Sequence, residues 1–392
     1  MLKRTSKRRF PVLASAIIGV VMCGNTVVRS ADAPPAATAQ PVHETAPNAA
    51  LQYWQGFAEL PVMDQAQRDI VEHFATAELN DQATKLIDAS SNSLRQLHRG
   101  AAINECDWGL NKQDGLMMLL PHLAKARDLA RIACLRARLE FQRGDAPSAL
   151  EDLGDVIVFA RHSGAGSTLI ALLVQVSIEQ VAVEVAGDHL ISAKGPALER
   201  FGQRLAHLPQ GGSMRESAIL IERQFGLDWL INQLKNVKPG EDWRGRIGQT
   251  FANEAGIQEL LKSTKSPEEL ITRLEASRPY YEQIPPLLDL PPDEFRSKAK
   301  ALYAKYANDP WGKMMLPDYS KIYGRQMSAE VRLAMLRAAI AVVESGQDAL
   351  KNFPDPAGHA PFRYESQGNG FELQSSLTVD GKPVKLNLRG SK

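Results

Sequence analysis

Acidic side chains lie next to tryptophan at two places, which are Glu105 and Asp107 beside Trp108, and Glu241 and Asp242 beside Trp243. Paired carboxylates supply the acid and the base in glycoside hydrolysis, and an indole ring can stack on a sugar. The pattern therefore permits an exported hydrolase that acts on a glycan or on peptidoglycan. Large aromatic side chains most often serve packing, however, and we expect Trp108 to pack as a plug beneath the helices.

No other group of residues indicates catalysis. The sequence lacks Gly-x-Ser-x-Gly, His-Glu-x-x-His, Walker and dinucleotide-binding patterns. The histidines are scattered singly, without the short spacing of metal ligands. We therefore predict no catalytic residue, no metal site and no cofactor. The candidate ligand-binding residues are Glu105, Asp107, Trp108 and His122.

Cys106 and Cys134 are the cysteines that remain if an N-terminal export segment containing Cys23 is removed. In an exported protein the pair can form one disulfide bond, provided that a loop brings the Cα atoms within about 7 Å. Two separate buried thiols are an equally good interpretation. A zinc site that combines both cysteines with His122 has no short-range ligand pair and is much less favoured.

Residues 119–186 predict three consecutive helices that organise the chain. The first helix repeats apolar residues at spacings of three and four, at Leu129, Ile132, Leu135 and Leu139. Gly144 ends this helix and Asp145 begins the next. The third helix, from Leu169, is apolar nearly all round, so neighbouring elements must cover it. Polar residues within it argue against a membrane span, namely Gln175, Glu179 and Gln180.

The pattern changes near the C-terminus. A long helix is predicted over 327–350, and apolar and polar residues then alternate in three runs. Asn-Gly at 369–370 and Asp-Gly at 380–381 separate the runs, which is typical of an antiparallel meander. The predicted fold is therefore mainly α, with stacked antiparallel helical hairpins forming an irregular α-solenoid over 48–326. A small α+β unit of three antiparallel strands follows over 327–392.

Residues 1–30 have the pattern of a secretory signal peptide, with a basic head, an apolar core over 10–23 and a preferred cleavage site after Ser30. Residues 31–47 are rich in alanine and proline and predict a disordered tether. We therefore expect export to the periplasm or beyond the cell, with no membrane span after cleavage. Retention of the segment or lipidation of Cys23 would instead tether the chain to a membrane.

The charge balance gives no electrostatic case for nucleic acid. Six of the 46 basic residues and none of the 45 acidic residues lie before Ala31. Removal of this segment leaves 40 basic and 45 acidic residues, which is a net charge of −5 with histidine neutral. Nucleic-acid-binding domains usually carry a basic surface. The expected partner is a protein or peptide of the cell envelope.

Two segments resemble known families. The predicted first hairpin resembles a tetratricopeptide unit in its small, turn and apolar positions, at Ala137, Gly144, Asp145, Ala149 and Leu153. The segments 355–358, 361–364, 370–371 and 380–381 resemble the C-terminal helix and three-stranded sheet of the type II secretion pseudopilins. The sequence departs from pseudopilins at its N-terminus, so the resemblance does not imply filament assembly.

The whole chain looks like uncharacterised exported bacterial helical proteins that combine such a hairpin with such a tail. The segments 106–110 and 120–123 also carry this resemblance. That family implies a fold and a location but no activity. We therefore hold two hypotheses, of which the first is a non-catalytic envelope protein whose helical stack binds a protein or peptide. The second is the exported hydrolase with paired carboxylates.

Overall fold

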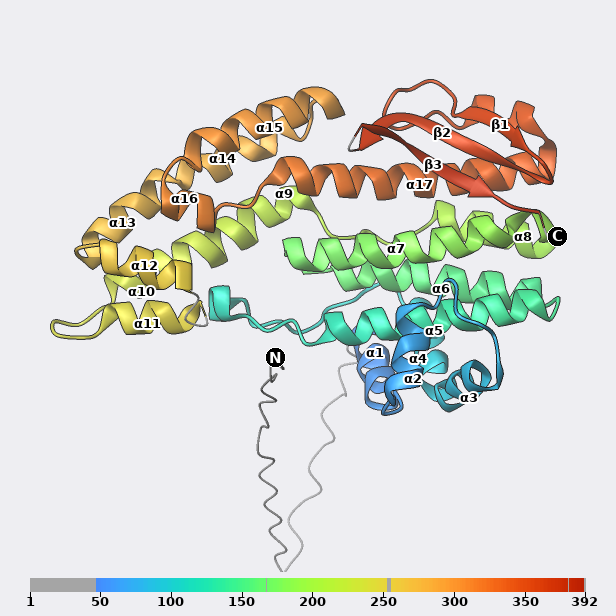
Figure 1. Ribbon diagram of the computed structural model, residues 1–392, viewed down its shortest axis with the longest axis horizontal. Coiled ribbons are helices and arrows are strands. Elements are labelled where there is room, and N and C mark those ends of the chain that lie inside the picture. Colours follow the sequence, from blue (N-terminus) through green and yellow to red (C-terminus); the bar gives the residue numbers. More distant parts are fainter. Residues whose placement is uncertain (1–46, 167, 252–254, 380, 391–392) are drawn as a thin grey trace, which may run out of the picture. The chain divides into compact units, whose positions relative to one another are not determined.

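The computed structural model describes residues 47–166, 168–251, 255–379 and 381–390. The predicted signal peptide, residues 31–46 of the predicted tether and Cys23 lie outside these residues. The described chain is mainly helical with one small antiparallel sheet, which confirms the predicted fold class (Figure 1).

The elements between Ala49 and Ala206 are α1 (Ala49–Ala58), α2 (Gln65–Glu72), α3 (Asp81–Ala89), α4 (Ser91–Ala101), η1 (Lys112–Met117), α5 (His122–Gln142), α6 (Ala146–Gly164), α7 (Leu169–His189), η2 (Leu190–Ser192) and α8 (Pro196–Ala206). The remaining elements are α9 (Met214–Glu216), the π-helix η3 (Ser217–Asp228), α10 (Trp229–Lys235), α11 (Trp243–Thr250), α12 (Ala255–Ser263), α13 (Pro267–Ala276), α14 (Arg278–Leu287), α15 (Pro292–Tyr306), α16 (Pro310–Met315), α17 (Tyr319–Ser345), η4 (Gln347–Asn352), β1 (Arg363–Gln367), β2 (Gly370–Val379) and β3 (Lys382–Leu388).

The helices α5 and α6 form the predicted hairpin. Gly144 adopts a φ of +82°, a conformation that favours glycine, and so ends α5. The side chain of Asp145 accepts a hydrogen bond from the backbone N–H of Ser148 at 3.2 Å and caps α6. Ala137 and Ala149 are both fully buried, which lets the two helices approach closely. Local turn chemistry therefore fixes the geometry of this hairpin.

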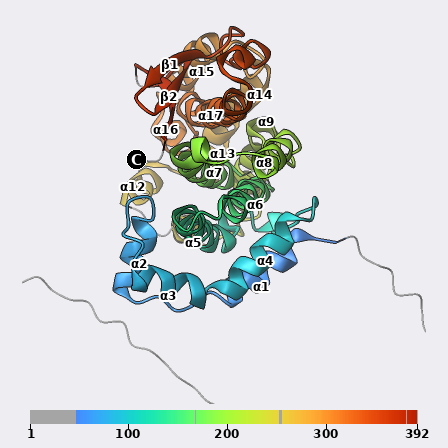
Figure 2. The same cartoon turned by 90° about the vertical axis from the view of Figure 1, so that its right-hand side faces the viewer.

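The apolar helix α7 packs against α5, α6 and α17. Figure 2 shows α5, α6 and α7 nearly end-on as neighbours. The segment Leu169–Ser192 is long and apolar enough to cross a membrane, but 67% of its most apolar window is buried inside the protein. Core helices and membrane spans share this composition, and here neighbouring helices cover the apolar surface, as the sequence predicted.

Buried apolar side chains of the described residues form two clusters. The first cluster contains side chains from α1 to α8, the second half of α17 and the sheet. The second cluster contains side chains from α9 to α16 together with the starts of α7 and α17. The predicted domain boundary at 326/327 therefore falls inside α17, and the C-terminal strands share a core with the N-terminal helices.

The C-terminal sheet has the order β1-β2-β3, with both pairs antiparallel. Its buried face packs on α7 and α17. The register shifts between Gln374 and Thr378 of β2. At this irregularity the carboxylate of Asp355 accepts hydrogen bonds from the hydroxyls of Ser375 and Ser376, each at 2.8 Å. These bonds, with two from backbone N–H groups, hold the pKa of Asp355 below its usual range although burial opposes this.

Candidate functional site

Trp108 lies inside the protein. Its side chain is 6% exposed, and its indole N–H donates a hydrogen bond to the backbone oxygen of His162 at 2.7 Å. The indole stacks on the His122 ring with a centroid distance of 4.3 Å and also faces Tyr53 and Phe57 of α1. The tryptophan therefore packs α1 against the start of α5 and is not available to stack on a sugar.

The two neighbouring carboxylates point away from this cluster. Glu105 and Asp107 are exposed, and their backbones tie the loop to the start of α1. The Glu105 carbonyl accepts from the N–H of Ala49 at 2.8 Å, and Asp107 exchanges two hydrogen bonds with the Asn48 side chain. Of the predicted binding residues, the structure brings Trp108 and His122 together in the core and leaves both acids in solvent.

The second acid–tryptophan pair also serves local structure. Glu241 accepts a hydrogen bond from the Lys238 backbone at 2.9 Å and pairs with Arg246. Asp242 caps α11 by accepting from the Gly245 N–H at 3.0 Å, and Trp243 is buried in the second cluster. The pockets described below are lined by none of these four acids, so neither acid–tryptophan pair lies in one of them.

Two buried histidines adjoin Trp108. Within the described chain, neither ring nitrogen of the fully buried His122 makes a hydrogen bond of normal geometry. Burial lowers the pKa of His122 to about 4, and the nearby Ser163 backbone offsets only part of this effect. His162 lies 2.7 Å from the Tyr53 hydroxyl through Nδ1 and 3.2 Å from the Asn104 carbonyl through Nε2. Because a carbonyl only accepts, Nε2 carries the proton and Nδ1 accepts from tyrosine.

We expect the variants His122→Phe and His122→Leu to reduce the acid sensitivity of folding. A histidine whose folded pKa lies near 4, below its usual value of 6.5, stabilises the fold above pH 6.5 and loses this contribution as the pH falls toward 4. Between about pH 7.5 and about pH 5 the loss is about 2 kcal/mol. The free energy of unfolding of each variant, from urea titrations, should therefore change by about 2 kcal/mol less than that of the wild type.

The comparison between variants is needed because buried acids act in the opposite direction. Burial raises the pKa of Glu140 to about 8 and that of Glu222 to about 7, so both stabilise the fold more at low pH. The two replacements at His122 differ in packing, which does not depend on pH, and should show the same difference from the wild type. Parallel stability curves for all three proteins would exclude a titrating His122.

The two predicted disulfide partners are free thiols in the structure. Cys134 lies in the middle of α5 and is fully buried, whereas Cys106 is partly exposed in the loop before η1. Burial raises the pKa of Cys106 to about 12 and raises that of Cys134 further, so neither thiol favours its reactive thiolate form. The interpretation as two separate thiols therefore describes the structure. Within the described chain, no cluster of His, Cys, Asp and Glu side chains could hold a metal ion.

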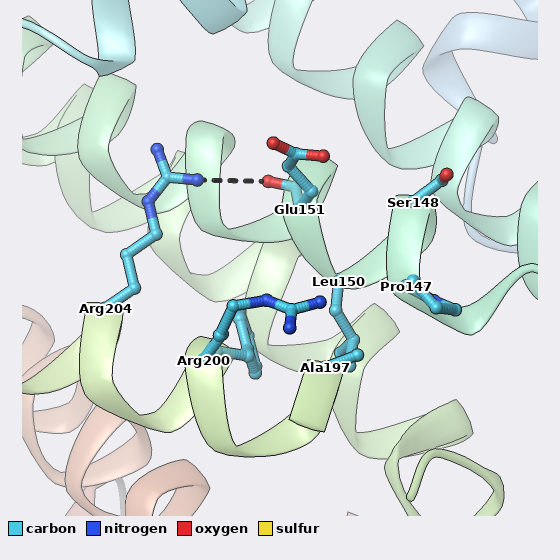
Figure 3. A pocket seen from close by; sticks show the side chains of 8 residues that line it. Pro147, Ser148, Leu150, Glu151, Ala197, Arg200 and Arg204 are labelled. Carbon is cyan, nitrogen blue, oxygen red and sulfur yellow. Dashed lines mark hydrogen bonds between the residues drawn. The ribbon is translucent and has the colours of Figure 1, made fainter. Parts of the chain in front are cut away.

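A groove crosses the face formed by α4, α6 and α8. It consists of two adjoining pockets that share Ser148 and Glu151 of α6. The pocket between α6 and α8 has a volume of about 430 Å³, and the pocket toward α4 and α5 has a volume of about 350 Å³. Figure 3 shows the first pocket, where Arg200 and Arg204 of α8 face residues of α6.

Ion pairs lie along the floor of this groove. The Arg136 guanidinium donates to both oxygens of the buried Asp152, through Nε at 2.6 Å and through a second nitrogen. Asp155 is also buried and accepts from Arg204 at 2.5 Å and from His98 at 2.9 Å. These contacts connect α5 with α6, α6 with α8 and α4 with α6. The floor is therefore rigid and its charges are largely compensated.

Two cations of the groove remain uncompensated. Arg95 of α4 and Arg200 of α8 are exposed and have no ion-pair or hydrogen-bond partner within the described residues. The carboxylate of Glu151, between them, has only the long contact of 3.8 Å to His98. Sequence reasoning missed these residues because they lie on two separate helices, α4 and α8. Only the packing of α4 and α8 against α6 brings them to one face.

Comparison with models of protein families, with curated proteins and with solved structures gave no significant match.

Proposed function

We propose that this chain is an exported, non-catalytic scaffold that binds an extended peptide segment of an envelope protein. The observation that carries the proposal is the groove across α4, α6 and α8, with its rigid floor and its free cations at the two sides. The apolar part of the groove comes from Pro147, Leu150 and Phe201. Export rests on the signal-like pattern of residues 1–30 alone.

The charges of the groove favour an acidic segment. Arg136 pairs with Asp152 and Arg204 pairs with Asp155, so these two carboxylates are not available to pair with a cationic ligand. The free groups are two arginines and one glutamate, so a carboxylate in the segment gains a charge-assisted hydrogen bond at either side. Apolar side chains between the carboxylates would contact Pro147 and Ala197, which are the apolar lining residues that are not buried. The expected ligand therefore alternates acidic and apolar residues.

The proposal is tested with a pool of short fluorescent peptides in which Asp or Glu alternates with apolar residues. Binding to the full-length chain is measured by fluorescence anisotropy. We expect the double variant Arg95→Glu/Arg200→Glu to weaken binding at least tenfold, which corresponds to about 1.4 kcal/mol, because both free cations become repulsive. The affinity of the wild type should also fall as the salt concentration rises.

The matched control is Arg99→Glu/Lys194→Glu. Both residues are exposed cations close in sequence to the pair under test, on α4 and just before α8, and neither lines the groove. This variant has the same change in net charge and should bind within about twofold of the wild type. Equal losses in the two double variants would show a nonspecific charge effect, and the groove would then not be the binding site.

A further inference from the structure

Another pocket, separate from the groove, lies where α7, α17 and β3 meet, and it shares no lining residue with the groove. Its volume is about 560 Å³. The lining residues come from segments far apart in sequence, and the contacts of β3 with α7 and α17 hold them together. They are Leu173, Val176, Ser177, Gln180, Arg325, Ser328, Arg332, Val379, Lys382, Pro383, Val384 and Lys385.

The charged side chains of this pocket have one sign. Four of the lining residues are Arg or Lys, and among the described lining residues none is acidic. Arg332 donates to the Ser328 hydroxyl at 2.9 Å, and Lys385 pairs with Glu372 of β2 at 2.7 Å. Arg325 and Lys382 are exposed and have no ion-pair or hydrogen-bond partner in the part of the chain that the structure describes. An anion in the pocket would therefore meet two uncompensated cations.

Apolar residues form part of the pocket wall, beside its polar and cationic side chains. Val176 and Val384 are buried beneath it, and Leu173 and Pro383 complete the apolar surface. The volume falls within the range of about 300 to 1,000 Å³ that is typical of pockets for small organic ligands. An inorganic anion would fill only a small part of this space. The ligand therefore combines an anionic group with an apolar body.

We infer that this pocket binds an organic phosphate, that is, a phosphate group joined to an apolar body. The arginine fork and the ammonium group are both common phosphate ligands in proteins. A phosphate monoester carries more negative charge than a carboxylate and so better balances a pocket with two free and two partly paired cations. The same monoester chemistry occurs in a soluble phosphate ester and in the headgroup of phosphatidic acid, and the experiment separates these two sources.

The test uses the full-length chain and phenyl phosphate as the probe, with isothermal titration calorimetry as the readout. We expect saturable binding with a dissociation constant below about 1 mM. Phenol and inorganic phosphate should each bind at least tenfold more weakly, because each lacks one half of the ligand. The variant Arg325→Ala/Lys382→Ala should also weaken binding at least tenfold. Both side chains are exposed, so the variant is expected to keep the fold, which circular dichroism checks.

The control variant is Lys321→Ala/Lys351→Ala. Lys321 is on α17 and Lys351 on η4, both are exposed, and neither lines the pocket. It should bind phenyl phosphate as the wild type does. Sedimentation with phosphatidylcholine vesicles that contain phosphatidic acid then identifies the source. Vesicle binding that is lost only in the Arg325/Lys382 variant indicates a lipid headgroup, and phenyl phosphate binding without vesicle binding indicates a soluble ester.

Two results would overturn the inference. The first is the absence of saturable phenyl phosphate binding by the wild type. The second is binding that is unchanged in the folded Arg325→Ala/Lys382→Ala variant, or that is weakened equally in the control variant. Either result would show that the basic residues around this pocket are an ordinary solvated surface.

Discussion

The variant Asp152→Ala is expected to lower the free energy of unfolding by about 3 kcal/mol. Asp152 is buried, and it accepts two hydrogen bonds from the Arg136 guanidinium, which is itself only 26% exposed. Removing the carboxylate leaves this cation without its main partner, and breaking a buried pair in this way costs about 3 to 5 kcal/mol. Glu140 lies 3.7 Å from Arg136, and its raised pKa falls when the Asp152 charge is removed, so it takes over part of the attraction and places the expected loss at the lower end. Urea denaturation at neutral pH measures it.

The paired replacement Arg136→Met/Asp152→Leu has a different expected result. Burial raises the pKa of Asp152 although Arg136 opposes this, so desolvation disfavours the charged form of this carboxylate. Two apolar side chains of similar size would avoid that desolvation, so the paired variant should lie within about 1 kcal/mol of the wild type or above it. A loss in the paired variant as large as that in Asp152→Ala would show that the ion pair itself stabilises the fold.

Glu151→Ala provides the matched control. Glu151 adjoins Asp152 on α6, but its side chain is 60% exposed, and its carboxylate makes only the long contact with His98. Its removal should change the free energy of unfolding by less than about 0.5 kcal/mol, as is usual for an exposed position. A large loss of unfolding free energy in Asp152→Ala and a small one in Glu151→Ala would show that the buried floor of the groove stabilises the fold. The exposed rim residue Glu151 would then be free to contact a ligand.

The parts of the fold that could be predicted from the sequence are those that short segments determine. Gly144 and Asp145 are adjacent, so the α5–α6 turn was predictable from one glycine and one cap. The Asn-Gly at 369–370 likewise predicted the β1–β2 turn, and the three runs of alternation predicted the strands. In each case the determining residues are close together, and no distant contact is needed to interpret them.

The parts that could not be predicted depend on contacts between distant segments. Arg136 lies among several basic residues of α5, and only the rotation of α5 against α6 directs it to Asp152. The pattern of α17 predicted its helix but not that its two ends enter different cores. The groove across α4, α6 and α8 and the pocket between α7, α17 and β3 are each formed by residues from three or more elements. In the sequence, the unpaired Arg95, Arg200 and Arg325 cannot be told from ordinary solvent-exposed arginines of a helix. Whether an arginine finds a partner depends on which side chains the tertiary structure brings near it.

The variant Trp108→Ala is expected to lower the free energy of unfolding by about 4 kcal/mol, the range found when a buried tryptophan is truncated. The indole contacts α1 through Tyr53 and Phe57 and α5 through His122, so its loss leaves a cavity where these helices meet. The carbonyl of His162 also loses its donor. Urea denaturation followed by circular dichroism measures the change without relying on tryptophan fluorescence.

Trp108→Phe separates the two contributions to this loss. Phenylalanine retains an aromatic ring against His122 but cannot donate to the His162 carbonyl, so the expected loss is smaller, at about 1 to 2 kcal/mol. This graded series follows from a packing role for the tryptophan. If Trp108→Ala instead left stability within about 1 kcal/mol of the wild type and abolished binding to glycan fragments, the indole would have to be accessible to ligand. The hydrolase hypothesis, with Glu105 and Asp107 as its carboxylates, would then regain its support over the peptide-binding scaffold.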